Sequence, residues 1–130
     1  MVNLKRRVGA PIRMGEMRVS SDGQNLHTLL GSCVGLALFD RNAGVGGLAH
    51  IVLPQSRGKS EHPGKFVDTA IPTLVRQLEQ LAGQNLTLKS KIAGGASMFA
   101  ANAATQIGEQ NVEACLRLLR ELRIPILAKD

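Results

Sequence analysis

The chain has 130 residues, of which 44% are hydrophobic and 20% are charged, and its formal net charge is +6. This length suits one globular domain, and the hydrophobic content excludes a disordered chain. No apolar run reaches the roughly 18 residues of a membrane span, and the basic N-terminus lacks the apolar stretch of a signal peptide. We therefore expect a single domain over residues 1–130 in the reducing cytoplasm, without membrane insertion and with Cys33 and Cys115 as free thiols.

The first half of the chain predicts strands. A short apolar alternation at residues 12–19 precedes a strand at residues 26–39. Asp, Asn and Gly then predict a turn at residues 40–44, and a second strand follows at residues 45–53, where Pro54 ends it. These two strands would form a hairpin.

The second half predicts helices and further strands. Apolar residues recur at helical spacing over residues 66–81, and Gly83 is a candidate C-cap. Pro72 lies inside this pattern and predicts a kink or a delayed start. A strand at residues 86–93, a helix at residues 107–122 and a strand at residues 124–128 follow. This order of elements predicts an α+β fold, in which helices cover a mixed sheet.

The positive charge suits an acidic partner. Nucleic acid is a weak candidate, because Trp and Tyr are absent and only three Phe are present to stack on bases. Arg117, Arg120 and Arg123 share one predicted helical face, which is more often a solvated surface than a binding site. The three His and two Cys form no metal-binding spacing, so we expect neither a metal site nor a cofactor.

Cys33 and His50 are chemically reactive residue types inside apolar predicted strands. Alternation along residues 26–39 puts the large residues, including Leu30, on the core face. It surrounds Cys33 with residues that have almost no side chain, namely Gly31, Gly35 and Ala37. Small neighbours would leave room for a substrate to approach the sulfur.

A hairpin centred between Arg41 and Asn42 would pair Cys33 directly with His50. Directly opposite side chains have Cβ atoms about 5 Å apart, which is near enough for an imidazole to meet a thiol. A one-residue shift of the turn, or a bulge at one of the nearby glycines, would break this pairing.

Such a pair would serve nucleophilic catalysis. His50 would take the proton of the thiol, and backbone N–H groups beside Cys33 would stabilise an oxyanion. In the alternative interpretation Cys33 only fills core volume and His50 is a hydrogen-bonded strand residue. Spacing alone favours this alternative, because single Cys and His residues are weak signals. Cys115 lies on the apolar side of a predicted helix and is expected to be inert, and His62 is expected to be exposed.

Several stretches together resemble the CheD family of chemoreceptor glutamine deamidases. They read "LLGSCVGLALFD", "GGLAHIVLPQS", "HPGKFVDTAIPTLV", "KIAGGASMF" and "IGEQNVEA", and the similarity runs over residues 17–128. The resemblance implies a CheD-like cysteine hydrolase fold and a protein-glutamine glutaminase activity. Such an enzyme hydrolyses glutamine side chains of methyl-accepting chemotaxis receptors to glutamate, through a thioester and with release of ammonia. It further implies that Cys33 is the nucleophile, that His50 is its partner and that a CheC-type phosphatase is a possible second partner.

Two features differ from the family pattern. The third catalytic residue of the family is a threonine six positions before the cysteine, where this chain has His27, with Thr28 one place later. A bulge could bring Thr28 into the site, His27 could substitute, or the third role could be weakened. The chain is also C-terminally short for the family, so we expect an uncovered sheet edge or a fragment. The alternative function is a weak or inactive CheD-like binding module that regulates a CheC-type phosphatase or docks on receptors.

Overall fold

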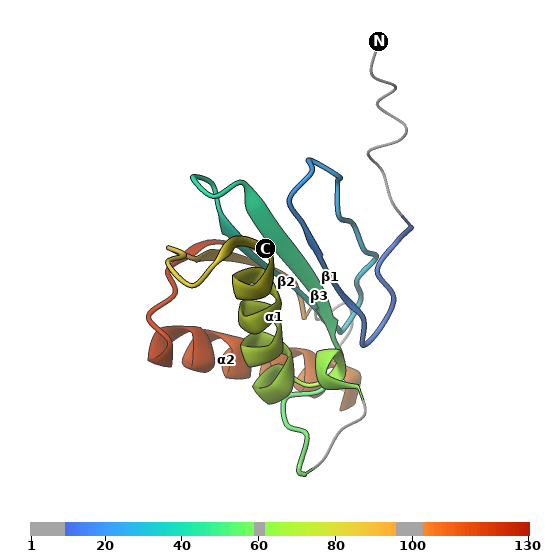
Figure 1. The fold of residues 1–130 in the computed structure, drawn as a ribbon. Coiled ribbons are helices and arrows are strands. Elements are labelled where there is room, and N and C mark those ends of the chain that lie inside the picture. Colours follow the sequence, from blue (N-terminus) through green and yellow to red (C-terminus); the bar gives the residue numbers. More distant parts are fainter. Residues whose placement is uncertain (1–9, 59–61, 96–102) are drawn as a thin grey trace.

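The computed structural model describes residues 10–58, 62–95 and 103–130. Within these ranges the chain forms one five-stranded sheet and two α-helices (Figure 1). The elements are β1 (Met17–Ser20), β2 (Val34–Asp40), β3 (Val45–Ile51), the 3₁₀ turn η2 (Pro63–Lys65), α1 (Val67–Ala82), β4 (Lys89–Gly94), α2 (Ala103–Glu121) and β5 (Ile126–Lys129). Part of one motif quoted above, at residues 96–99, lies outside the described residues.

The sheet is mixed. Its strand order is β1-β3-β2-β4-β5. The pairs β1–β3, β3–β2 and β2–β4 are antiparallel, whereas β5 runs parallel to β4. The predicted α+β fold with a mixed sheet is therefore confirmed.

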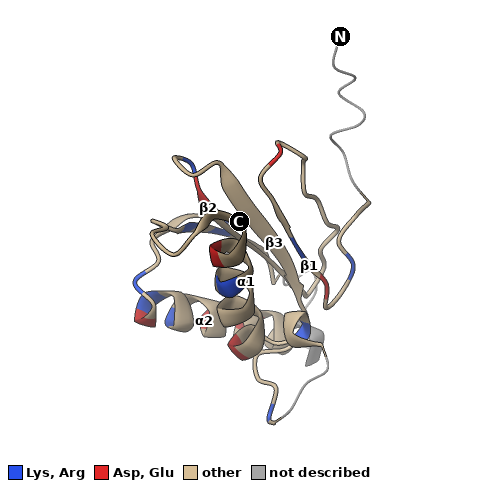
Figure 2. Cartoon of the chain, in the orientation of Figure 1, with Lys and Arg blue, Asp and Glu red and all other residues tan. Residues whose placement is uncertain are grey.

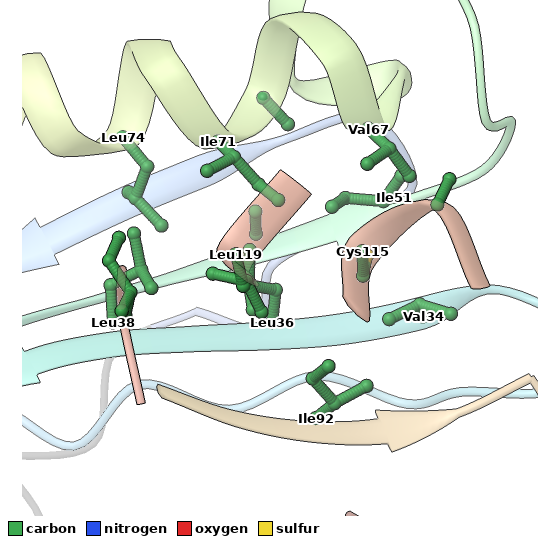
Figure 3. Packing of buried hydrophobic residues seen from close by; sticks show 14 of the residues in the cluster. Val34, Leu36, Leu38, Ile51, Val67, Ile71, Leu74, Ile92, Cys115 and Leu119 are labelled. Carbon is green, nitrogen blue, oxygen red and sulfur yellow. The ribbon is translucent and has the colours of Figure 1, made fainter. Parts of the chain in front are cut away.

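Both helices pack on the same face of the sheet. α1 contacts β1 and β3, while α2 contacts β2, β4 and α1. Figure 3 shows side chains of β2, α1 and α2 converging in this layer. Fully buried side chains there include Leu36, Leu38, Leu74 and Leu119. Because side chains alternate along a strand, the residues that alternate with Leu36 and Leu38 in β2 point to the opposite face of the sheet, which the two helices do not cover.

The β2–β3 hairpin is centred differently from the sequence prediction. Asp40 pairs with Val45 across a four-residue turn, and Gly35 rather than Cys33 pairs with His50. Gly44 adopts a φ of +69° and donates its N–H to the carbonyl of Arg41 at 3.2 Å. This longer turn shifts the register, so the direct pairing of Cys33 with His50 is wrong.

The first long strand is also shorter than predicted, because β2 begins at Val34 rather than at residue 26. Continued pairing would need β3 to extend beyond Ile51. The N–H groups of Val52 and Leu53 instead donate to the carbonyl of Lys65, at 2.9 and 3.0 Å. Pro54 follows and has no N–H to donate. Residues 26–33 therefore have no partner strand on the β3 side and do not extend β2.

The helices largely match the prediction. α1 begins at Val67 and continues through Pro72, so the proline does not delay its start. Gly83 caps its end with a φ of +94°, donating its N–H to the carbonyl of Glu79 at 2.7 Å, as predicted. α2 begins earlier than predicted, at Ala103.

The predicted arginine face is solvated. Arg117 and Arg120 are exposed on α2, and Arg123 is exposed just after the helix ends. Figure 2 shows acidic as well as basic residues along α2, so this helix does not present a surface of one charge. No helix in the described ranges is both long enough and apolar enough to cross a membrane.

Candidate active site

His50 lies on the sheet face that the helices leave free. Its neighbours Ala49 and Ile51 belong to the core under the helices, so His50 points the other way. The residue is nevertheless 5% exposed. Its N–H donates to the carbonyl of Glu16 at 3.0 Å, and its carbonyl accepts the N–H of Gly15 at 2.8 Å. The segment just before β1 thus fixes the backbone of His50.

Thr28 contacts the imidazole directly. Its Oγ1 lies 2.7 Å from His50 Nδ1 and 2.5 Å from the carbonyl oxygen of Ile12. A hydroxyl has a single proton, and the carbonyl of Ile12 can only accept. Thr28 therefore donates to Ile12 and accepts the Nδ1–H of His50. This arrangement leaves the lone pair of His50 on Nε2, which is the form a general base requires.

Cys33 lies immediately before β2 and is 8% exposed. Gly35 is opposite His50, and Cys33 precedes Gly35 by two residues. The two reactive residues therefore belong to the same end of the β2–β3 pair. Burial raises the pKa of the Cys33 thiol, so the resting sulfur keeps its proton at neutral pH.

The backbone around Cys33 is held by Gly94, the last residue of β4, and by Gly95, which follows it. The Cys33 carbonyl accepts the N–H of Gly95 at 2.9 Å. Gly94 has a φ of +92°, and a side chain there would collide with the Cys33 carbonyl oxygen. Sequence reasoning missed this role, although consecutive glycines at the end of a strand are a known signal of close backbone approach.

The small residues near Cys33 do not all leave open space. Leu30 lies over Gly35. A Cβ added to Gly35 would be 2.8 Å from Cδ1 of Leu30. The prediction that Leu30 belongs to the core face is therefore wrong, because residues 26–33 are not part of the strand. Gly31 differs, since an added Cβ there would have no neighbour within 4 Å among the described residues.

The remaining candidate residues lie apart from the contact between Thr28 and His50. The backbone carbonyl of His27 accepts the N–H of Ile12 at 2.9 Å. The buried Nδ1 of the His27 side chain has no hydrogen-bond partner among the described residues. Cys115 is fully buried in the core, as predicted, and burial raises its pKa to about 12. His62 is exposed, also as predicted.

Ile12 was not anticipated from the sequence. Its side chain is 2% exposed, and its carbonyl oxygen receives the Thr28 hydroxyl. The apolar alternation at residues 12–19, to which Ile12 belongs, carries no signal for this contact, because the interacting group belongs to the backbone. Across the described ranges, no three His, Cys, Asp or Glu side chains are grouped so that they could hold a metal ion.

Comparison with known proteins relates the chain to one family. The family model described as CheD chemotactic sensory transduction matches residues 52–130. A Methanococcus maripaludis (strain S2) protein named probable chemoreceptor glutamine deamidase CheD is 40% identical over 121 residues, which cover 92% of this chain and 79% of the relative. The chemoreceptor glutamine deamidase CheD of Thermotoga maritima is 44% identical over 120 residues, covering 92% and 76%. That of Halalkalibacterium halodurans is 43% identical over 126 residues, covering 92% and 78%.

Proposed function

Because this chain belongs to the CheD family, we propose that it is a chemoreceptor glutamine deamidase, with Cys33 as nucleophile, His50 as general base and Thr28 as the residue that orients His50. The observation that carries this proposal is the contact between Thr28 Oγ1 and His50 Nδ1. That contact leaves the lone pair of the neutral imidazole on Nε2, and the register that pairs His50 with Gly35, two residues after Cys33, supports the choice of nucleophile. The substrate is the side-chain amide of a receptor glutamine.

The first half of the reaction forms a thioester. His50 Nε2 takes the proton of the Cys33 thiol, and the sulfur attacks the amide carbon of the glutamine. The tetrahedral intermediate collapses when its C–N bond breaks, and the protonated imidazole returns its proton to the leaving nitrogen, so ammonia departs.

The second half consumes one water molecule. Nε2 of His50 removes a proton from the water, and the resulting hydroxide attacks the thioester carbon. The C–S bond breaks, the protonated imidazole returns its proton to the sulfur, and the released carboxylic acid passes its own proton to ammonia. The net change is glutamine plus water to glutamate plus ammonium. We infer that the reaction takes place in the cytoplasm, with a CheC-type phosphatase as a second candidate partner.

The raised pKa of Cys33 makes His50 necessary in this scheme. A thiol with a low pKa would already be a thiolate at neutral pH and would need no base. Burial has the opposite effect here, so the thiolate forms only as its proton moves to the imidazole.

The deciding experiment incubates the cytoplasmic fragment of a chemoreceptor with the protein and follows its peptides by mass spectrometry. Each glutamine converted to glutamate adds about one mass unit. We expect conversion with the parent protein and none with Cys33→Ala. The matched control is Cys115→Ala, which should keep its activity and lose about 1 kcal/mol of stability through a small core void.

His50→Ala should lower turnover by roughly 10²–10⁴-fold and slow the alkylation of Cys33 near neutral pH. Equal conversion by the parent and Cys33→Ala would refute the proposed nucleophile. A parent protein that binds the fragment yet leaves every glutamine intact would instead fit a binding module.

A further inference from the structure

The lining of a groove of about 650 Å³ includes Gly15 and Glu16, whose backbones are hydrogen-bonded to that of His50. The lining also includes Arg13, Met14, Val52 and Lys65. These residues come from the turn before β1, the end of β3 and the turn η2. The first of these segments also holds the backbone of His50, so the groove and the imidazole share their supporting structure.

The groove lies at the end of the strand that carries His50. The last pair of β2 and β3 is Val34 with Ile51. Val52, the next residue, lines the groove, and its N–H donates to the carbonyl of Lys65, another lining residue, at 2.9 Å. The groove therefore begins two residues after His50.

One part of the lining is apolar and open to solvent. The side chain of Met14, at the turn before β1, is 68% exposed. Outside the lining, Leu29, which follows Thr28 in the sequence, is 87% exposed. Both segments that fix the imidazole thus present an exposed apolar side chain, and methionine adapts well to varied partner surfaces.

The other part of the lining has a net positive charge. Arg13 is engaged by Glu16, whose Oε1 lies 3.4 Å from the Arg13 side chain and 2.8 Å from its backbone nitrogen. Lys65 is exposed, and its Nζ lies 5.7 Å from the centre of the Phe66 ring. Arg13, Glu16 and Lys65 therefore leave one positive charge, which Lys65 carries.

We propose that this groove holds the receptor segment on one side of the target glutamine, with an apolar side chain against Met14 and Val52 and a carboxylate at Lys65. The proposal rests on the proposed deamidase activity and adds the sequence features of its protein substrate. A buried thiol is reached only by the glutamine side chain itself, which is the same in every protein. The choice among glutamines then depends on contacts with neighbouring residues, and the groove, whose lining also holds the backbone of His50, is a surface that offers them.

The test measures KM and kcat for a chemoreceptor cytoplasmic fragment with two variants. Lys65→Glu should raise KM about tenfold at low salt with little change in kcat, because an attraction becomes a repulsion. The difference from the parent should shrink in about 0.5 M salt. Met14→Gln keeps the length of the side chain but not its apolar character, and should raise KM several-fold at any salt concentration.

Matched controls come from exposed positions outside the groove. Arg76→Glu makes the same change in net charge on α1, and Leu81→Gln replaces another exposed hydrophobic residue. Both should keep the parent KM. The rate at which iodoacetamide alkylates Cys33 should be the same in all four variants, because this small neutral probe does not need the groove.

The outcomes separate this inference from the proposed function. No conversion by the parent protein would reject the deamidase activity itself. Conversion by the parent together with an unchanged KM in Lys65→Glu and Met14→Gln would reject the groove as a substrate site. A rise in KM that Arg76→Glu reproduces would also reject it, because net charge rather than the groove would then be responsible.

Discussion

The hydroxyl of Thr28 determines the chemical state of the imidazole. It donates its proton to the carbonyl of Ile12, so it can only accept from His50. An acceptor at Nδ1 becomes more valuable when the ring gains a positive charge, because hydrogen bonds to charged groups are stronger. In the proposed mechanism, Thr28 would therefore favour the protonated imidazole that forms once the thiol has lost its proton.

Thr28→Val should reduce turnover by about 10–100-fold, the equivalent of losing one hydrogen bond to a charged group. Thr28→Ser restores the hydroxyl and should recover most of the activity. His27→Thr should have little effect, because the His27 side chain has no described contact with His50. Turnover on a receptor fragment and thermal unfolding of each variant separate this role from a general loss of stability. A fully active Thr28→Val would show that His50 works without an orienting partner.

At the scale of the elements, the β2–β3 turn is stabilised by a carboxylate. Asp40 accepts the N–H of Thr87 at 2.8 Å and that of Ala43 at 3.1 Å. These bonds, with that of Thr87 the more important, hold the pKa of Asp40 below its usual range. One side chain thus fixes the four-residue turn and joins it to the loop before β4.

The pKa of Asp40 is lower in the folded protein than in the unfolded one, so the ionised carboxylate stabilises the fold. This stabilisation is present above the usual carboxyl pKa of about 4 and is lost as the pH falls through the pKa of the folded protein. Asp40→Asn should therefore be less stable than the parent at pH 7, and the difference should shrink near pH 3. Urea unfolding at the two pH values measures it. Glu121→Gln, which removes a negative charge outside the hairpin, is the control. A difference that does not depend on pH would rule out this role of the carboxylate.

The sequence predicted elements whose pattern is local and missed those set by distant contacts. The helical spacing and Gly83 predicted α1 to within a residue at each end, because both signals lie in the helix itself. The apolar residues before Cys33 resemble a strand equally well, yet they lack a partner because Val52 and Leu53 pair with Lys65. Cys33 and His50 were predicted as site residues from their types and the family resemblance, and this assignment stays a prediction. The contact of Thr28 depends on the backbone of Ile12, which no pattern in the sequence reveals.

At the scale of the whole molecule, glycine contacts join Cys33 to the sheet and to α2. Gly95 donates its N–H to the Cys33 carbonyl and lies against Gly108 of α2. A Cβ on Gly108 would lie 2.9 Å from the Gly95 carbonyl oxygen, which is too close for ordinary packing. The position of α2 therefore affects the loop that carries the thiol.

Gly108→Ala tests this connection. Alanine favours the helix by about 1 kcal/mol, whereas overpacking costs about 1–3 kcal/mol. The collision should dominate, so the free energy of unfolding should fall by about 1 kcal/mol and the alkylation rate of Cys33 should change. In Gly46→Ala, the control, the added methyl would have its nearest neighbour at 3.6 Å. Higher stability of Gly108→Ala with an unchanged alkylation rate would contradict the connection.

The dependence of His50 on Thr28 and Ile12 has a consequence for how the protein responds to stress. Both partners lie in stretches outside the strands, and such stretches open more easily than a sheet whose core two helices cover. A fluctuation that releases residues 10–16 or 26–33 would leave the imidazole without its acceptor while the core stays folded. Gentle warming or dilute denaturant would then silence the site reversibly, well before the midpoint of unfolding, and amide hydrogen exchange at Ile12 would report the same opening.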